Sequence, residues 1–327
     1  MRAVIPVAGI GTRLRPHTHT LPKVLLNVAG KPILGHILDK LVERDIRDCT
    51  IVVGYMAEKV EKYVRRNYDL NVTFVEQKDR QGLGHSIWTA RATFADEPLL
   101  IILGDTIFDV DFAPVLARDV SSLGVKHVDD PRRFGVAETD ADGTVTKLTE
   151  KPDEPTSNLA LVGLYYVRET RLLLDCLNHL IEQDIRTRGE YQLTDALQEM
   201  IDRGARFDTF EVDGWYDCGK PETLLATNRH LLEHQKNSGA QPDGCIICPP
   251  SYVAPTAQIK HSVIGPYATV ADGAIVENSI ISNSIVGSDA RVQGVVLDES
   301  IIGNKAFLRG GANRLNVGDS SEIDFSR

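Results

Sequence analysis

The first hundred residues alternate short apolar runs with longer stretches in which apolar positions recur at helical spacing. The strand-like runs lie at residues 3–7, 50–53 and 72–75, and the helical stretches at residues 33–44, 58–67 and 83–94. Strands that alternate with helices in this way predict a parallel sheet with helices packed on it. Residues 99–103 read Leu-Leu-Ile-Ile-Leu, which is typical of a strand buried on both faces. The pattern therefore predicts an α/β fold whose central strand ends at Gly104 and Asp105.

The pattern changes after residue 105, where strand-like runs are joined by turn-rich segments such as residues 140–143. We expect strands at residues 125–128, 135–138, 145–148, 161–167 and 207–212, and helices at residues 170–183, 193–203 and 222–235. Short strands joined by turns predict a mixed extension of the first sheet. The predicted fold class is thus α/β, with a Rossmann-like, mixed but mainly parallel sheet flanked by helices.

The last third of the chain is repetitive, because an apolar residue returns every five or six positions. The recurring residues are Val253, Ile259, Ile264, Val270, Val276, Ile281, Val286, Val292, Leu297, Ile302 and Leu308. This short period is the signature of hexapeptide β-helix repeats, whereas strands of a β-sandwich return about every 8–12 residues. We expect a short left-handed parallel β-helix of about four coils. Two domains follow, at residues 1–236 and 245–320, with a polar linker between them.

Composition supports a globular protein of two domains. The chain has 327 residues, 42% of them hydrophobic and 25% charged, a balance that excludes disorder, collagen and coiled coil. Its 46 acidic and 36 basic side chains give a net charge of -10, which argues against a nucleic-acid partner.

The same sequence favours a cytoplasmic protein without a membrane partner. We recognise neither a signal peptide at the N-terminus nor an apolar stretch of about 20 residues. Five scattered cysteines, an odd number, suit a reducing compartment better than a disulfide framework. Cys245 and Cys248 have no second close pair of ligands, so we do not expect zinc.

The most informative loop follows the first strand and reads Gly9-Ile-Gly-Thr-Arg-Leu-Arg-Pro16. Glycines permit positive φ and let backbone N–H groups approach phosphate oxygens, while Arg13 and Lys23 supply the positive charge that a polyphosphate needs. The loop lacks the Gly-Lys-Ser/Thr of a P-loop and the third glycine of the dinucleotide fingerprint. It therefore predicts a phosphate-binding loop of another kind.

Several further segments follow this loop in a recognisable order. They are Pro22-Lys23, Gln81-Gly-Leu-Gly-His85, Leu103-Gly-Asp-Thr-Ile-Phe108, Asp130-Pro-Arg-Arg-Phe-Gly-Val136, Glu150-Lys-Pro152, Arg188-Gly-Glu190 with Leu193-Thr-Asp195, and Gly214-Trp-Tyr-Asp-Cys-Gly219. In this order they resemble the sugar-1-phosphate nucleotidyltransferases, and most of all the long glucose-1-phosphate thymidylyltransferases that carry a C-terminal hexapeptide β-helix. The resemblance implies that a sugar 1-phosphate attacks the α-phosphorus of a nucleoside triphosphate and that pyrophosphate leaves, with Mg²⁺ as the cofactor.

The resemblance also implies the roles of individual residues. Arg13 and Lys23 would hold the triphosphate, and Asp105 and Asp217 would bind Mg²⁺, so these four are the expected catalytic residues. Asp105 stands where a buried strand ends, which is where open α/β sheets place ligands. One or two carboxylates are also what Mg²⁺ takes when phosphate oxygens fill its other positions.

Two further groups of residues would bind the rest of the substrates. Nucleotide binding falls to Ala8, Gly9, Gly11, Thr12, Arg13, Gln77 and Gly82, with Gln81 as a competitor of Gln77 for the base. Sugar-phosphate binding falls to Gly135, Glu150, Lys151, Tyr165 and Arg188.

The exact substrates stay open at this point. Val7-Ala8-Gly9 replaces the Ala-Gly-Gly of thymidylyltransferases and is closer to uridylyltransferases, whereas residues 214–222 resemble the thymidylyltransferases with a β-helix. We favour dTTP with glucose 1-phosphate and keep UTP as the alternative, since one methyl group discriminates by only about 1–3 kcal/mol. A non-catalytic, nucleotide-sugar-sensing subunit is a second alternative. We also expect a homo-oligomer, with the β-helix as the candidate interface.

Overall fold

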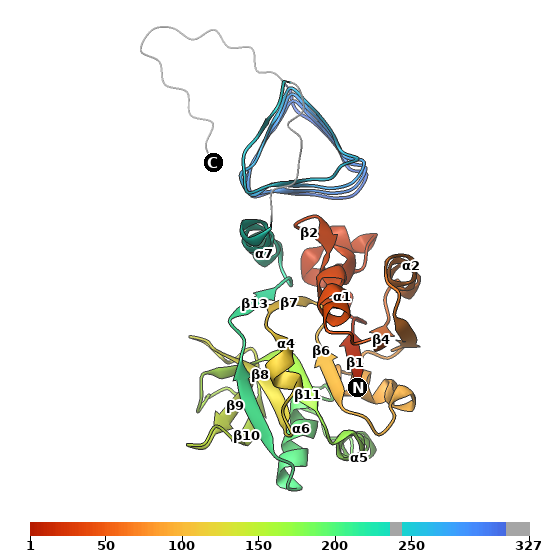
Figure 1. Ribbon diagram of the computed structural model, residues 1–327, viewed down its shortest axis with the longest axis vertical. Helices are drawn as coiled ribbons and strands as arrows, with labels where there is room; N and C mark the ends of the chain where they lie inside the picture. The colour runs from red at the N-terminus through yellow and green to blue at the C-terminus, as the bar shows by residue number, and fades with distance from the viewer. Residues whose placement is uncertain (236–243, 312–327) are drawn as a thin grey trace. The chain divides into compact units, whose positions relative to one another are not determined.

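A computed structural model describes residues 1–235 and 244–311 (Figure 1). The chain divides into two compact units, Met1–Thr227 and Asn228–Arg327. Most of the predicted linker and the last residues of the predicted second domain, 312–320, lie outside the described residues. No helix among the described residues is long and apolar enough to cross a membrane.

The first unit is built on a nine-stranded mixed sheet. Its strands are β1 (Arg2–Pro6), β4 (Asp48–Val53), β5 (Asn71–Glu76), β6 (Leu99–Ile102), β8 (Ser121–His127), β9 (Gly135–Thr139), β10 (Val145–Glu150), β11 (Leu159–Val167) and β12 (Phe207–Glu211). The order is β10-β9-β11-β6-β1-β4-β5, and β8 pairs with β11 and β12. Strands β6, β1, β4 and β5 run parallel, while β11 pairs antiparallel with β6, β8 and β9. The predicted Rossmann-like sheet with its mixed extension is confirmed.

Helices cover both faces of this sheet (Figure 1). They are α1 (Ile33–Glu43), α2 (Ala57–Asn67), α3 (Leu83–Thr89), α4 (Phe112–Leu116), α5 (Thr170–Glu182) and α6 (Leu193–Asp202), and α7 (Pro221–His234) follows. In β6, Leu100 and Ile102 pack on the face of α1, α2 and α4, whereas Leu99 and Ile101 pack on the face of α3, α5 and α6. Successive side chains of a strand point to opposite faces, so a strand covered on both sides must be apolar throughout.

Because β6 is buried on both faces, substitutions in this strand test how much the core stabilises the first unit. We expect Ile101→Ala to lower the free energy of unfolding of the first unit by about 3 kcal/mol, because Ile101 is fully buried and its truncation leaves a cavity. The same change at Ile185, which is 40% exposed, should cost under about 0.5 kcal/mol. Urea unfolding followed by tryptophan fluorescence measures both, since Trp88 and Trp215 lie in the first unit. Equal losses in the two variants would contradict this account of the core.

Several elements differ from the sequence-based expectation. The strand expected at 125–128 begins earlier, at Ser121, because the buried hydroxyl of Ser121 donates to Glu169 and accepts from the backbone N–H of Arg168. The helix expected at 83–94 ends at Thr89 and continues as a separate 3₁₀ turn, Arg91–Thr93. Apolar periodicity does not distinguish these two kinds of helix at a terminus.

Four short strands of the first unit were not expected from the sequence. They are β2 (Asn27–Val28), β3 (Lys31–Pro32), β7 (Thr106–Asp109) and β13 (Gly214–Asp217). The last two form an antiparallel ribbon that joins segments about a hundred residues apart in the chain. Such pairing is non-local, so neither strand shows it by its own pattern.

The second unit is a parallel β-helix of four coils, in agreement with the sequence. Its strands are β14 (Ile246–Ile247), β15 (Tyr252–Val253), β16 (Gln258–Lys260), β17 (Val263–Ile264), β18 (Thr269–Val270), β19 (Ile275–Glu277), β20 (Ile280–Ile281), β21 (Ile285–Val286), β22 (Arg291–Gln293), β23 (Val296–Leu297), β24 (Ile301–Ile302) and β25 (Phe307–Arg309). They form three sheets of four strands, and the coils outline a triangle (Figure 1). The predicted left-handed β-helix class is thereby confirmed.

The repeating apolar residues form the core of this β-helix. Ile264 stacks on Ile281, and Val276 stacks on Val292. One coil takes 16 or 17 residues. Five- and six-residue repeats fit three sides because the corners turn tightly, with Asn278 and Asp289 in the left-handed region at φ 49 and 58.

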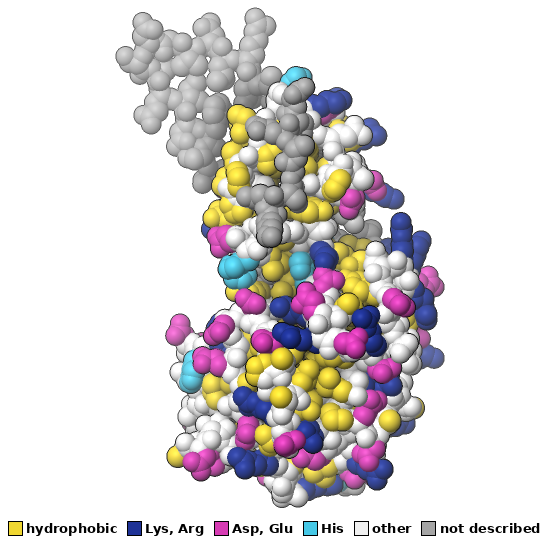
Figure 2. Space-filling view, viewed as in Figure 1, with side chains coloured by type: hydrophobic (Ala, Val, Ile, Leu, Met, Phe, Trp, Pro, Cys, Tyr) yellow, Lys and Arg dark blue, Asp and Glu magenta, His cyan; other side chains and the backbone are white. Residues whose placement is uncertain are grey.

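Part of the outer surface of the β-helix is apolar. Figure 2 shows acidic and basic side chains interspersed on the visible face of the first unit. In the β-helix, Ile246, Ile280 and Val296 are 54%, 47% and 75% exposed, and they belong to one stacked column of the sheet β14-β17-β20-β23. This sheet therefore presents a row of β-branched side chains to solvent.

Candidate active site

An open cleft of about 220 Å³ lies at the carboxyl ends of β1 and β6. It is lined by Pro6, Val7, Gly9, Lys23, Val24, Leu83, Leu103 and Asp105. Parallel strands that end side by side leave room for a ligand where the connections diverge, which is why open α/β sheets bind ligands at this edge. Three residues predicted for the site, Gly9, Lys23 and Asp105, are among its walls.

The two glycines of the loop after β1 have different structural roles. Gly11 has φ 69, and a Cβ there would lie 2.9 Å from Cβ of Lys23, so this position needs glycine both for its backbone and for its neighbour. Its carbonyl accepts a hydrogen bond of 2.8 Å from the hydroxyl of Thr18, which fixes the turn. Gly9 has no atom within 4 Å of where a Cβ would be, and it faces open space in the cleft.

Lys23 and Asp105 form an ion pair within the cleft. Nζ of Lys23 lies 2.8 Å from Oδ2 of Asp105, and the two side chains are 9% and 45% exposed. Lys23 begins a 3₁₀ turn, Lys23–Leu25, which fixes its backbone beside the cleft. The carboxylate of Asp105 is paired with the amine of Lys23 and is still partly exposed to solvent. A fixed cation beside an accessible carboxylate can hold a phosphate and a metal ion next to each other.

The ribbon of β7 and β13 brings Asp217 to the same place. In its register Asp217 lies opposite Thr106, and the backbone N–H of Cys218 donates to the carbonyl of Asp105 over 3.1 Å. A Cβ at Gly219 would lie 2.7 Å from Oδ1 of Asp217 and 3.1 Å from Nη2 of Arg13. The structure thus brings together Arg13, Lys23, Asp105 and Asp217, the four residues to which the resemblance assigns catalytic roles.

Asp105 and Asp217 are ligands of the kind that can hold Mg²⁺. No cluster of three or more His, Cys, Asp and Glu side chains occurs among the described residues, so a site made only of protein ligands is absent there. Mg²⁺ needs just one or two carboxylates when phosphates and water complete its octahedron. Asp105 and Asp217 provide hard oxygen ligands of this kind beside the cations of Arg13 and Lys23.

The residue that follows Asp217, Cys218, has a buried thiol. Cys218 is fully buried, and burial raises its pKa to about 12, so it is a neutral thiol at physiological pH. Its Sγ lies 3.8 Å from Oγ1 of Thr227. This environment is inert, so Cys218 is not activated as a nucleophile.

The residues predicted to read the base follow the end of β5. Gln77 is 5% exposed, and its backbone N–H donates to Val53 in the neighbouring strand β4. Arg80 donates from Nε to the carbonyl of Ala8 over 3.1 Å, which ties this segment to the glycine loop. Gln81 accepts a hydrogen bond from Arg186, so its amide already has a partner.

Gly82 is required by its contact with another segment of the chain. It has φ 111, and a Cβ there would lie 2.4 Å from the carbonyl oxygen of Tyr191. The backbone of Tyr191 in turn bonds to Gln81 and Gly84. Any larger residue at position 82 would push the backbone of Tyr191 away from Gly82. The sequence alone did not reveal that constraint.

The residues predicted for the sugar phosphate also gather in one place. Gly135 pairs with Glu150 across β9 and β10, and a Cβ at Gly135 would lie 2.9 Å from Oγ1 of Thr194 and 3.2 Å from Oε2 of Glu150. Glu150 forms an ion pair of 3.0 Å with Lys151. Arg188 donates to the carbonyl of Lys151 over 2.9 Å.

Tyr165 is more buried than Glu150, Lys151 and Arg188. It is 4% exposed within the core on the α5 and α6 face, and burial, with a smaller contribution from the Glu150 charge, raises its pKa. The structure places it beneath the sugar-phosphate residues.

Sequence reasoning assigned no role to two residues of this region. Thr194 donates to Oε2 of Glu150 over 2.7 Å, and Asp195 has a buried Oδ2 without a hydrogen-bond partner among the described residues. Burial raises the pKa of Asp195. The Leu193-Thr-Asp195 segment was part of the family resemblance, and that was the one available signal.

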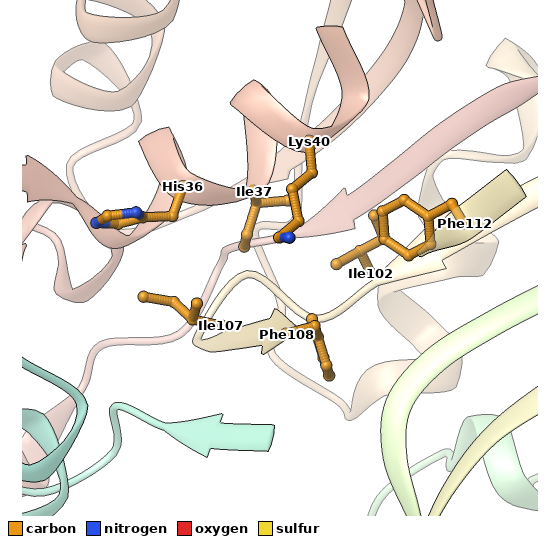
Figure 3. A pocket seen from close by; sticks show the side chains of 7 residues that line it. All are labelled: His36, Ile37, Lys40, Ile102, Ile107, Phe108 and Phe112. Carbon is orange, nitrogen blue, oxygen red and sulfur yellow. The ribbon is translucent and has the colours of Figure 1, made fainter. Parts of the chain in front are cut away.

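A second cavity lies outside this site, between α1, β6, β7 and α4 (Figure 3). It has about 10 Å³ of free space, enough for about one water molecule, and is lined mainly by apolar side chains, among them Ile37, Ile107 and Phe112. It contains none of the predicted site residues. Its wall includes β7, the strand that follows Asp105.

Comparison with known proteins agrees with the geometry of the cleft. Residues 2–234 match the family described as Nucleotidyl transferase. The chain is 31% identical to the low-salt glycan biosynthesis nucleotidyltransferase Agl11 of Haloferax volcanii, over 99% of each chain. It is also 31% identical to a glucose-1-phosphate thymidylyltransferase of Streptomyces antibioticus, again over 99% of each. A solved structure of UDP-glucose pyrophosphorylase with UDP-glucose is similar with a TM-score of 0.61 and 25% identity, covering 72% of this chain and 99% of that one.

Proposed function

This chain belongs to the nucleotidyl transferase family, and from that premise we propose that it joins a sugar 1-phosphate to the nucleotidyl group of dTTP, with glucose 1-phosphate as the favoured sugar phosphate. The observation that carries the proposal is the convergence of Arg13, Lys23, Asp105 and Asp217 at one cleft beside the glycine loop. These charges suit a polyphosphate and its metal ion.

The chemistry needs positioning and charge neutralisation more than a covalent intermediate. A phosphate oxygen of the sugar 1-phosphate forms a bond to the α-phosphorus, and the bond from that phosphorus to the bridging oxygen of pyrophosphate breaks. Lys23 and Arg13 stabilise the negative charge that grows on the α-phosphate and on the leaving group. Gly9 leaves space for the triphosphate beside the backbone of the loop.

We propose that Asp105 and Asp217 hold Mg²⁺. Bound there, Mg²⁺ would supply charge neutralisation on the phosphate oxygens. The ion pair with Lys23 keeps the carboxylate of Asp105 in place, and the ribbon of β7 and β13 keeps Asp217 beside it.

The sugar phosphate would lie along the region of Gly135 and Glu150. Glu150 accepts from Thr194 and is paired with Lys151, so its carboxylate is fixed and can accept hydrogen bonds from sugar hydroxyls. Lys151 and Arg188 would face the phosphate. Tyr165 would support this wall from the core.

UTP remains the second candidate nucleotide. The similar structure with UDP-glucose favours it, and the full-length thymidylyltransferase relative favours dTTP. Both bases share the same hydrogen-bonding edge and differ by one methyl group.

We expect pyrophosphate release with Mg²⁺ to be fastest for dTTP or UTP with glucose 1-phosphate. The assay combines five nucleotides, dTTP, UTP, CTP, GTP and ATP, with glucose, galactose, mannose and N-acetylglucosamine 1-phosphates. The second pyrimidine nucleotide should stay within about a hundredfold of the first, because one methyl group changes binding by about 1–3 kcal/mol. Reactions without sugar phosphate are the control. If pyrophosphate release is fastest with GTP or ATP, the proposal is contradicted. If no combination releases pyrophosphate, the result favours a nucleotide-sugar-sensing subunit.

We also propose that the chain forms a homo-oligomer in the cytoplasm. The exposed column that contains Ile246, Ile280 and Val296 supports self-association, because contiguous exposed apolar side chains often mark an interface. Cys49, Cys176, Cys218 and Cys248 form no disulfide, which suits a reducing compartment. Sedimentation of Ile280→Glu against the unchanged protein tests the assembly, and an identical mass for both would count against this face.

A further inference from the structure

The side-chain amide of Gln77 is held in one orientation by two neighbours. Its Nε2 lies 3.3 Å from the carbonyl oxygen of Gly82 and 3.0 Å from Nδ1 of His85. A backbone carbonyl can only accept, so the amide nitrogen must be the atom that faces Gly82. Both of its hydrogens are then used, and Oε1 accepts from no described residue.

This orientation determines the protonation of His85. Since the Gln77 nitrogen donates to Nδ1, that ring atom must carry a lone pair, and the proton of the neutral imidazole lies on Nε2. The ring is also fixed in place, because it stacks between Trp88 and Tyr191 with centroid distances of 5.8 Å and 6.3 Å. His85 is therefore a rigid acceptor aimed at Gln77.

The surroundings of His85 keep it neutral. Burial lowers its pKa from the ordinary value of 6.5, and the charges of Arg186 and Arg91 lower it further, against an opposing effect of Asp79. Each arginine stacks on a neighbouring ring, Arg186 over Tyr191 at 4.1 Å and Arg91 over Trp88 at 3.6 Å. The acceptor state of Nδ1 is thus the stable one at neutral pH.

We propose that His85 is a positioning residue that contributes to the base preference, because together with the Gly82 carbonyl it holds the Gln77 amide so that Oε1 is the atom offered to the nucleobase. The inference rests on the proposed function and extends it. Thymine and uracil carry an N–H donor at N3, which can donate to Oε1 of Gln77. Cytosine has an acceptor at N3, so two acceptors would face each other and no hydrogen bond would form. His85 therefore favours dTTP and UTP together over CTP, and it does not separate dTTP from UTP.

Two substitutions at this position give a matched test. His85→Leu removes one of the two acceptors, so Gly82 alone holds the Gln77 amide and the amide turns over more readily, whereas His85→Asn keeps an acceptor oxygen near the place of Nδ1. Titration calorimetry with the full chain and Mg²⁺ gives the dissociation constants of dTTP, UTP and CTP without any sugar phosphate. Pyrophosphate release, measured separately, decides the proposed activity, so the two ideas can fail independently.

We expect His85→Leu to weaken dTTP and UTP about tenfold, the cost of one hydrogen bond, while CTP binding changes little. His85→Asn should recover most of the loss. Equal weakening of all three nucleotides, or no loss for dTTP and UTP, would overturn the proposal. Failure of the unchanged protein to bind any of the three would overturn it as well.

Acidification is the second arm of the test. Protonated His85 carries N–H at Nδ1 and can no longer accept from Gln77, so dTTP should weaken as the pH falls below 6.5 and through the lowered pKa of His85. His85→Asn lacks this titration, and it controls for protonation of the nucleotide itself. Identical pH profiles for the two proteins would contradict the role of His85.

Discussion

Replacing Asp105 with Asn should lower kcat for pyrophosphate release by about a thousandfold or more. The substitution keeps the size of the side chain but removes the negative charge that faces both Lys23 and the proposed metal ion. Charge stabilisation by a metal ion contributes several kcal/mol to such reactions, and each 1.36 kcal/mol is a factor of about ten in rate. Asp217→Asn should have a similar effect, because Asp217 lies opposite Thr106, the residue that follows Asp105.

Asp109→Asn is a matched control for this experiment. Asp109 lies on the same strand, β7, but its side chain is 68% exposed and 3.9 Å from Lys40. We expect its kcat within about twofold of the unchanged protein, since exposed ion pairs contribute little. Circular dichroism and a Mg²⁺ titration separate loss of metal binding from loss of fold. Asp105→Asn with near-normal kcat would contradict the proposed metal site.

Replacing Lys23 with Met should lower kcat/KM by about a hundred- to a thousandfold. The amine is buried to 9% exposure and lies against Asp105, so no other described cation is held in that position. Removal of a fixed donor that stabilises charge in the transition state has a cost of this size. Methionine preserves the length of the apolar stem, so packing against Gly11 should be little changed.

Lys62→Met serves as the matched control, since Lys62 is an exposed residue of α2. Initial rates over a range of dTTP concentrations give kcat and KM for each variant. We expect Lys62→Met to match the unchanged protein. A loss in Lys23→Met that appears only in KM would show that Lys23 stabilises the bound ground state and the transition state equally, and would contradict a role specific to the transition state.

Much of the fold could be predicted because its signals are local. The run at 99–103 indicated a doubly covered strand, and β6 is one, at Leu99–Ile102. The five- to six-residue period indicated a β-helix, since each apolar residue repeats one coil later. The start of β8 could not be predicted because it contains the polar residues Ser121 and Ser122. Polar residues fit a buried strand only if groups elsewhere in the chain form hydrogen bonds with them, as Glu169 does with Ser121.

The candidate site was predictable to the level of residue types and order. Gly9, Arg13, Lys23 and Asp105 were identified from the loop and from the end of a strand. Thr194 and His85 were not assigned roles, because each acts on another predicted residue, Glu150 or Gln77, through a side-chain contact that sequence spacing does not encode.

The sequence by itself determined the two architectures and the kinds of charged and glycine residues available for phosphate chemistry, because periodicity and turn chemistry depend on near neighbours. Only the tertiary structure decided that Asp217 lies beside Asp105, and that Gln77 offers an oxygen rather than a nitrogen. Both depend on pairing between segments far apart in the chain: the ribbon of β7 and β13, and the packing of Tyr191 against Gly82 and His85. Hydrogen bonds of this kind are specified by the whole fold and not by any one segment.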